Sequence, residues 1–174
     1  MSGLKFIIRF WLLVVVMTSV CSCATVLESY TPEQKLSAER IVIKRQVDLR
    51  GNTLSLPEGC TLVFKKGGLI SNGTIEGSDT RIKYKGPCFD GVIIKGTWNI
   101  PNIRSEMFLS YDKTNLTNLF KLQNGSIKNR IYVAPGLYYV NSNVQRAALP
   151  LTSNTTLILD GDIMLEEQTN NQYY

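Results

Sequence analysis

Residues 56–70, Leu-Pro-Glu-Gly-Cys-Thr-Leu-Val-Phe-Lys-Lys-Gly-Gly-Leu-Ile, recur in altered form at residues 151–165, Leu-Thr-Ser-Asn-Thr-Thr-Leu-Ile-Leu-Asp-Gly-Asp-Ile-Met-Leu. In both copies a short turn leads into a β-prone run, and a break containing glycine precedes a second apolar pair. A strand–turn–strand unit that recurs along a chain indicates a repeat architecture, in which neighbouring units bury each other's apolar faces. This pattern predicts how the chain is built and identifies no reaction.

The spacing of apolar residues from residue 41 onward is typical of β-strands. Residues two apart share one face of a strand, and the pattern predicts strands of three to five residues. Gly51, Gly73 and Gly91 open comparable runs at a roughly even, solenoid-like spacing. Stacked parallel coils would place the apolar residues of one coil about 4.8 Å from those of the next. The apolar pairs are Ile41/Ile43, Val47/Leu49 and Leu54/Leu56.

Two segments carry helix signals. Thr31-Pro32-Glu33 supplies a capping residue, a proline for the first helical position and an early acid, so we expect a short capping helix that continues to Arg40. Residues 112–122 have an apolar stripe at helical spacing, and Asn124-Gly125 ends the segment. The stripe comprises Leu116, Leu119, Phe120 and Leu122, after a cap at Asp112 or Thr114.

The segment over about 110–165 combines an Asp-x-Thr start, this helix, Pro135-Gly136-x-Tyr138 and Ser153-Asn154-x-Thr156-Leu157. The combination resembles the N-terminal portion of the pectate lyase superfamily, the right-handed parallel β-helices that include polygalacturonases, polysaccharide lyases and phage tailspikes. The resemblance implies an all-β fold: a short right-handed parallel β-helix over 41–174, truncated at its C-terminus, with an N-terminal capping helix and one inserted short helix. A β-sandwich with one helix is the alternative, but it would not reuse the same string.

The N-terminus has the features of a secretory leader. Lys5 and Arg9 precede an apolar run that is too short to span a bilayer comfortably. Val20-Cys21-Ser22-Cys23 resembles a bacterial lipobox, so residues 1–22 are a predicted lipoprotein signal peptide and Cys23 is the predicted lipid attachment. Residues 23–40 would then be the lipidated N-terminus and capping helix. The expected location is the bacterial cell envelope, membrane-anchored and periplasmic or surface-exposed; a plain signal peptide of a secreted protein is the alternative.

The composition excludes several chemistries. The chain has no histidine, which excludes Ser-His and Cys-His catalysis and histidine zinc sites. Cys60 and Cys88 lie beyond the leader without C-x-x-C spacing, so no metal site is predicted; they either pair or pack as small hydrophobes. Without residues 1–22, 17 basic and 14 acidic residues remain, and no basic stripe interleaved with aromatics suggests nucleic acid. No cofactor is predicted.

The sequence gives little support for any catalytic group. Inverting glycosidases need two facing carboxylates, but Asp160 and Asp162 flank a glycine and align with lysines in the earlier copy, so we expect a solvated corner there. Arg81-Ile82-Lys83 matches a family string but comes far too early, and we interpret it as an exposed strand. The residues that could instead abstract a proton or stack on sugars are Lys83, Lys85, Arg104, Lys128, Trp98, Tyr132, Tyr138 and Tyr139.

We therefore assign no catalytic residue. The resemblance implies an envelope lipoprotein related to polysaccharide-degrading enzymes, with a membrane as one partner through the lipid anchor and an acidic polysaccharide as the other. If the chain were active, it would be a polysaccharide hydrolase or lyase. The alternative is a structural or adhesive surface β-helix, similar to a tailspike stem, with no glycan activity.

Overall fold

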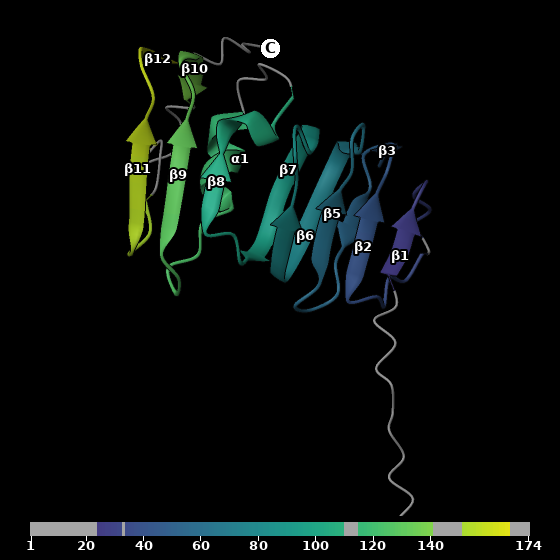
Figure 1. Ribbon diagram of the computed structural model, residues 1–174. Coiled ribbons are helices and arrows are strands. Elements are labelled where there is room, and N and C mark those ends of the chain that lie inside the picture. Colours follow the sequence, from purple (N-terminus) through teal and green to yellow (C-terminus); the bar gives the residue numbers. More distant parts are fainter. Residues whose placement is uncertain (1–23, 33, 110–114, 141–150, 168–174) are drawn as a thin grey trace, which may run out of the picture.

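A computed structural model describes residues 24–32, 34–109, 115–140 and 151–167 (Figure 1). Within these residues the chain forms twelve strands, the α-helix α1 (Asn115–Lys121) and the 3₁₀ turn η1 (Ser105–Met107). The described part of the protein is therefore an all-β fold with very little helix. The strands are β1 (Ala24–Leu27), β2 (Arg40–Ile43), β3 (Gln46–Asp48), β4 (Thr53–Ser55), β5 (Thr61–Phe64), β6 (Leu69–Lys83), β7 (Phe89–Trp98), β8 (Asn102–Arg104), β9 (Asn129–Val133), β10 (Gly136–Val140), β11 (Thr155–Leu159) and β12 (Ile163–Glu167).

All strand pairings in the described residues are parallel. One sheet contains β1 to β7, a second has the order β11-β9-β8, and β10 pairs with β12. Figure 1 shows β1, β2 and β5 side by side at one end of the molecule, β9 and β11 at the other, and α1 between them. The chain returns to the same register at nearly equal intervals, because Ile41, Leu62 and Ile82 are successive partners on β2, β5 and β6.

Strand β6 differs from the short strands that the sequence predicts. It has 15 residues and pairs in succession with β3, β4 and β5, while its other edge pairs with β7. The prediction of three to five residues is also wrong for β7, which has ten. Left-handed backbone at Asn72 (φ 54°) and Asp79 (φ 49°) turns β6 while its backbone pairing continues on either side. The corners of the fold therefore lie inside these strands as well as between strands.

Apolar side chains at register positions build the core. Val47, Ile70 and Phe89 are successive partners, and Phe108 joins Phe89 through an isolated bridge. All four are buried, and the rings of Phe89 and Phe108 lie 5.4 Å apart. Each fully buried apolar side chain contributes about 1.5–3 kcal/mol, so these columns hold successive returns of the chain together. The residues of the predicted apolar pairs, all buried, are Ile41, Ile43, Val47, Leu49, Leu54 and Leu56.

Both copies of the repeated string form a strand, a turn and a second strand. The first copy contains β5 and the start of β6, and the second contains β11 and the start of β12. Gly59 and Asn154 hold aligned positions at φ 65° and 62°, and Gly67 and Gly161 turn the two breaks at φ 81° and 89°. Glycine and asparagine are the residues that adopt this left-handed conformation most readily. The predicted repeat is thus confirmed in local structure.

The two predicted helices have different outcomes. The helix within 112–122 is confirmed as α1, and its apolar stripe is buried; the caps Asp112 and Thr114 lie outside the described residues. The prediction of a capping helix over 31–40 is wrong, because the described residues of this segment, which are all but Glu33, form no helix. Leu36 and Ala38 pack against the core at a spacing of two, which suits an extended chain.

Helix α1 covers an edge of β7. The Asn118 side chain is buried, donates to the carbonyl of Val92 at 2.6 Å and accepts from the amide of Ile94 at 3.3 Å. Asn124, just beyond the helix, donates to the carbonyl of Trp98 at 3.1 Å. Backbone groups buried without partners are costly, so these two amides stabilise the end of the seven-stranded sheet.

Candidate functional site

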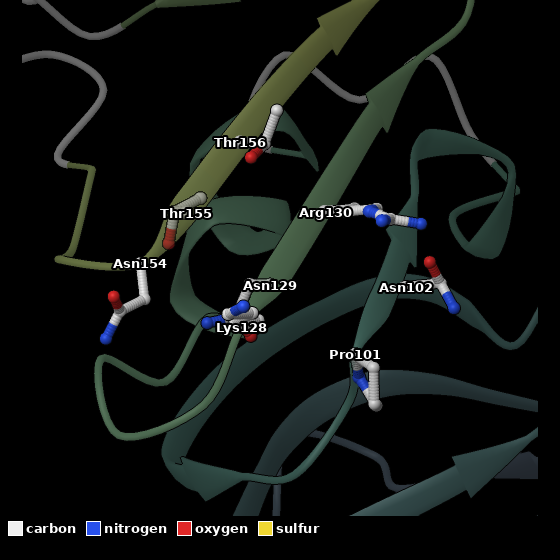
Figure 2. A pocket seen from close by; sticks show the side chains of 8 residues that line it. All are labelled: Pro101, Asn102, Lys128, Asn129, Arg130, Asn154, Thr155 and Thr156. Atoms are coloured by element: carbon white, nitrogen blue, oxygen red, sulfur yellow. The ribbon is translucent and has the colours of Figure 1, made fainter.

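The outer face of the β8–β9–β11 sheet carries a row of polar side chains. Asn102, Arg130 and Thr156 are register partners on the three strands. Their neighbours Ile103 and Ile131 are fully buried, as the alternation of a strand requires. The polar row therefore faces outward, and Figure 2 shows Arg130 extending toward Asn102 on the adjacent strand.

A cleft of about 470 Å³ lies along this row. Lys128 and Arg130 supply two cations, and none of the described residues that line the cleft is acidic. Within the described part of the chain, the side chains of Asn102, Lys128, Arg130 and Thr156 are exposed and form no hydrogen bond or ion pair with the protein. Their donors are consequently available to an anionic or hydroxyl-rich ligand. The lining residues are Pro101, Asn102, Lys128, Asn129, Arg130, Asn154, Thr155 and Thr156.

Two asparagines at the end of the cleft have structural roles. Asn129 is buried and donates to the carbonyls of Asn124 at 2.6 Å and Ile127 at 3.0 Å. Asn154 donates to the carbonyl of Gly125 at 3.1 Å. These bonds fix the turn before β9 against the turn before β11. The free side chains of the row thus stand on a base held by backbone and side-chain hydrogen bonds.

A third cation lies in the next row of the same face. Arg104 and Tyr132 are register partners, and the guanidinium carbon lies 4.4 Å from the centre of the tyrosine ring. Such a cation–π contact orients the arginine, and its N–H groups form no hydrogen bond or ion pair with the described residues. From the strand spacing and the rise per residue, the Arg104 and Arg130 backbones are about 8 Å apart. The face therefore presents separated positive charges.

No family model, curated protein or solved structure matches this chain. Membership of the pectate lyase superfamily accordingly stays a prediction. The described residues include no helix that is long and apolar enough to cross a membrane. The predicted signal peptide, residues 1–22, and the predicted lipid attachment, Cys23, lie outside the described residues.

The other candidates from the sequence do not converge on the cleft. Asp160 and Asp162 are exposed in the turn between β11 and β12, as expected of a solvated corner, and Arg81 is exposed on β6. Trp98 is fully buried and donates to the carbonyl of Lys95 at 2.9 Å, so it is a core residue. Tyr138 is half-buried on β10 and donates to the carbonyl of Ala134 at 2.9 Å. The Tyr139 side chain is not among those that the structure describes.

Cys60 and Cys88 are free and buried, so packing as small hydrophobes is the alternative that holds. Cys60 lies 3.9 Å from the Thr80 hydroxyl, and burial raises the pKa of both thiols. Among the described residues, no group of three or more acidic, cysteine or histidine side chains could hold a metal. The residues that sequence reasoning missed are Asn102, Arg130 and Thr156; the Ser153-Asn154-x-Thr156 string was a signal, but only for the fold.

Proposed function

We propose that this chain is an envelope lipoprotein with a short right-handed parallel β-helix, and that it binds an acidic polysaccharide on the outer face of β8, β9 and β11. The observation that carries the binding proposal is the exposed row of Asn102, Arg130 and Thr156, whose side chains have no partner among the described residues. Lys128 and Arg104 add positive charge on either side of that row.

The parallel pairing supports the β-helix. Parallel neighbours need a crossover connection, which in most folds is a helix. Here β5 follows β2 in the sheet with no helix between them in the described residues, and β6 pairs with β3, β4 and β5 along consecutive segments. A chain that coils and lies on its own previous turn accounts for both features.

The chemistry of the cleft suits a uronate. The Arg130 guanidinium can bind a carboxylate through two parallel N–H bonds, which a lysine ammonium cannot reproduce. The amide of Asn102 and the hydroxyl of Thr156 can exchange hydrogen bonds with sugar hydroxyls. Successive strands are about 4.8 Å apart, so one sugar unit can contact more than one strand.

The same cleft does not support hydrolysis. Glycosidases use a protonated and an ionised carboxyl group on opposite sides of the scissile bond, and no described lining residue is acidic. Binding without cleavage is therefore the proposed activity.

Calorimetric titration of the purified full chain tests this proposal. Oligogalacturonate should bind saturably, and a neutral oligosaccharide of similar length should not, because the cleft offers cations for a carboxylate. High salt should weaken the binding, since the charges are exposed and screened. No heat with millimolar oligogalacturonate would contradict glycan binding and favour the structural or adhesive alternative.

The membrane anchor is tested separately. Ala24 is the first residue of β1, so a lipid on Cys23 would be attached directly to the sheet without a linker. Mass spectrometry of the mature N-terminus should find an acylated peptide that begins at Cys23. An unmodified N-terminus at another residue would instead favour the secreted protein.

A further inference from the structure

A second concave surface lies at the corner between β5 and β6, on elements other than those of the glycan cleft. It measures about 800 Å³ and is formed by the turn at 65–68, the segment 83–87 and Leu109. Four lysines line it, and none of the described lining residues is acidic. These lysines are Lys65, Lys66, Lys83 and Lys85.

The strand register brings Lys44 beside Lys65. Phe64 pairs with Ile43, so Lys65 and Lys44 follow directly after paired residues on neighbouring strands, and Val63 pairs with Lys83 on the next strand. The amide of Lys65 donates to the carbonyl of Ile43 at 2.9 Å, which fixes this alignment. Parallel strands are about 4.8 Å apart. Lys44 and Lys65 are therefore close neighbours, and Lys66, Lys83 and Lys85 line the same groove as Lys65. We call these five residues the basic corner (Lys44, Lys65, Lys66, Lys83 and Lys85).

The protein does not neutralise the basic corner. All five lysines are exposed, and none forms an ion pair within the described part of the chain. The nearby Arg45 is different, because Glu28 pairs with it at 2.6 Å. Like charges in neighbouring register positions repel each other. An anion from outside the protein would relieve this repulsion.

An apolar element lies beside the charges. Leu109 is 51% exposed at the rim of the groove. Tyr84 is half-buried between Lys83 and Lys85, and burial raises its pKa to about 12, so the phenol stays neutral at physiological pH. Cations next to an exposed leucine suit a ligand whose anionic group lies at the edge of an apolar phase. A soluble polyanion would leave Leu109 in water.

We propose that the basic corner binds the anionic phospholipid headgroups of a membrane surface, with Leu109 entering the boundary between headgroups and acyl chains. Polybasic surfaces bind such membranes by charge, with about a fivefold gain in affinity for each lysine near the surface. The groove volume of about 800 Å³ is large enough to admit a headgroup between the lysines. This contact requires no lipid on Cys23.

Vesicle co-sedimentation tests the proposal with the chain that lacks the predicted leader, residues 1–22, and carries Cys23→Ser, which removes the predicted acylation site. The chain should bind phosphatidylcholine vesicles that contain phosphatidylglycerol and bind pure phosphatidylcholine vesicles much more weakly. The double variant Lys65→Gln/Lys85→Gln should bind the anionic vesicles about 25-fold more weakly. The control Lys95→Gln/Lys121→Gln removes the same charge from exposed sites outside the corner and should change binding little.

Two further readouts separate a membrane surface from other anions. The variant Leu109→Trp should show a blue shift of its added fluorescence with anionic vesicles and none with neutral vesicles. Equal losses of vesicle binding in the two double variants, or no fluorescence shift in Leu109→Trp, would overturn the proposal. Release of the chain from vesicles by millimolar inorganic phosphate would also overturn it, because it would indicate a site for a single free anion. Loss of oligogalacturonate binding in Lys65→Gln/Lys85→Gln would overturn it as well, because it would indicate a glycan site.

Discussion

The side-chain amide of Asn118 donates a 2.6 Å hydrogen bond to the backbone carbonyl of Val92, which lies far earlier in the chain. Its oxygen accepts from the amide of Ile94, further along the same strand. One side chain thus offers β7 the donor and the acceptor that a neighbouring strand would offer. In the described residues no strand pairs with this stretch of β7 on that side. Helix α1 therefore closes this edge of the seven-stranded sheet.

Asn118→Leu should lower the free energy of unfolding by about 2–4 kcal/mol, because leucine has similar volume but leaves one buried N–H and one buried C=O without partners. Urea unfolding followed by circular dichroism measures the change. The exposed Lys121→Ala in the same helix is the control and should cost less than about 0.5 kcal/mol. Equal stability of Asn118→Leu and the parent would show that this amide does not stabilise the edge of β7.

Gly96→Ala should destabilise the fold by about 2–4 kcal/mol. Gly96 has φ 78°, and an added Cβ would overlap the Gly77 carbonyl oxygen on the paired strand. Gly86→Ala is the matched control, because its Cβ would meet nothing within 4 Å and its φ is not left-handed. Thermal unfolding of the two variants should therefore differ clearly. Similar melting temperatures would mean that the two strands separate easily at this point.

The fold was predictable where burial follows local periodicity. The spacing of two over residues 41–56 predicts the buried faces, and the helical stripe predicts α1. The prediction of the capping helix was wrong because Thr31-Pro32 is a local signal, whereas contacts with distant residues hold the segment in place. Tyr30 donates to the carbonyl of Thr53 at 2.6 Å, and the carbonyl of Glu39 accepts from the amide of Thr61 at 2.8 Å. Tertiary contacts of this kind override local preference.

The candidate site was hardly predictable. Asn102, Arg130 and Thr156 are far apart in the sequence, and only the strand register makes them neighbours. The inserted helix makes this return of the chain longer than the earlier ones, so no fixed spacing in the sequence marks the row. The absence of catalytic histidine chemistry, by contrast, follows from composition alone.

Arg130→Gln should weaken oligogalacturonate binding about 10- to 100-fold. A hydrogen bond to a charged group contributes about 1.5–3 kcal/mol, and glutamine removes the charge and the bidentate geometry. Arg81→Gln makes the same change on the exposed part of β6 and should leave affinity intact. Calorimetry on both variants measures the difference. A comparable loss in Arg81→Gln would point to net charge instead of the cleft.

Stability should fall as the pH rises above about 9. Burial raises the pKa of the Cys88 and Cys60 thiols above 9.0 and that of Tyr84 from 10.0 to about 12. The unfolded chain therefore loses these protons first, so the stabilisation is complete below the unfolded pKa values and declines above them. Each group can lower the free energy of unfolding by at most about 1.4 kcal/mol per pH unit.

Urea unfolding from pH 8 to pH 11 measures this decline. Cys88→Ala should reduce the slope above pH 9 relative to the parent chain, because the alanine carries no proton to release. Identical slopes would show that the Cys88 thiol does not contribute. The free energies at pH 8 serve as the reference, since the substitution also alters packing.

The regular return of the chain to register also bears on how such a protein can change over evolutionary time. A deletion or duplication of one whole return replaces each buried residue with its register partner, as when Leu62 takes the place of Ile41. A change of half a return would send apolar residues to the outside. In the proposed β-helix, the length of the molecule could therefore vary in whole units, and a surface such as the row at Arg130 could be extended without redesign of the interior.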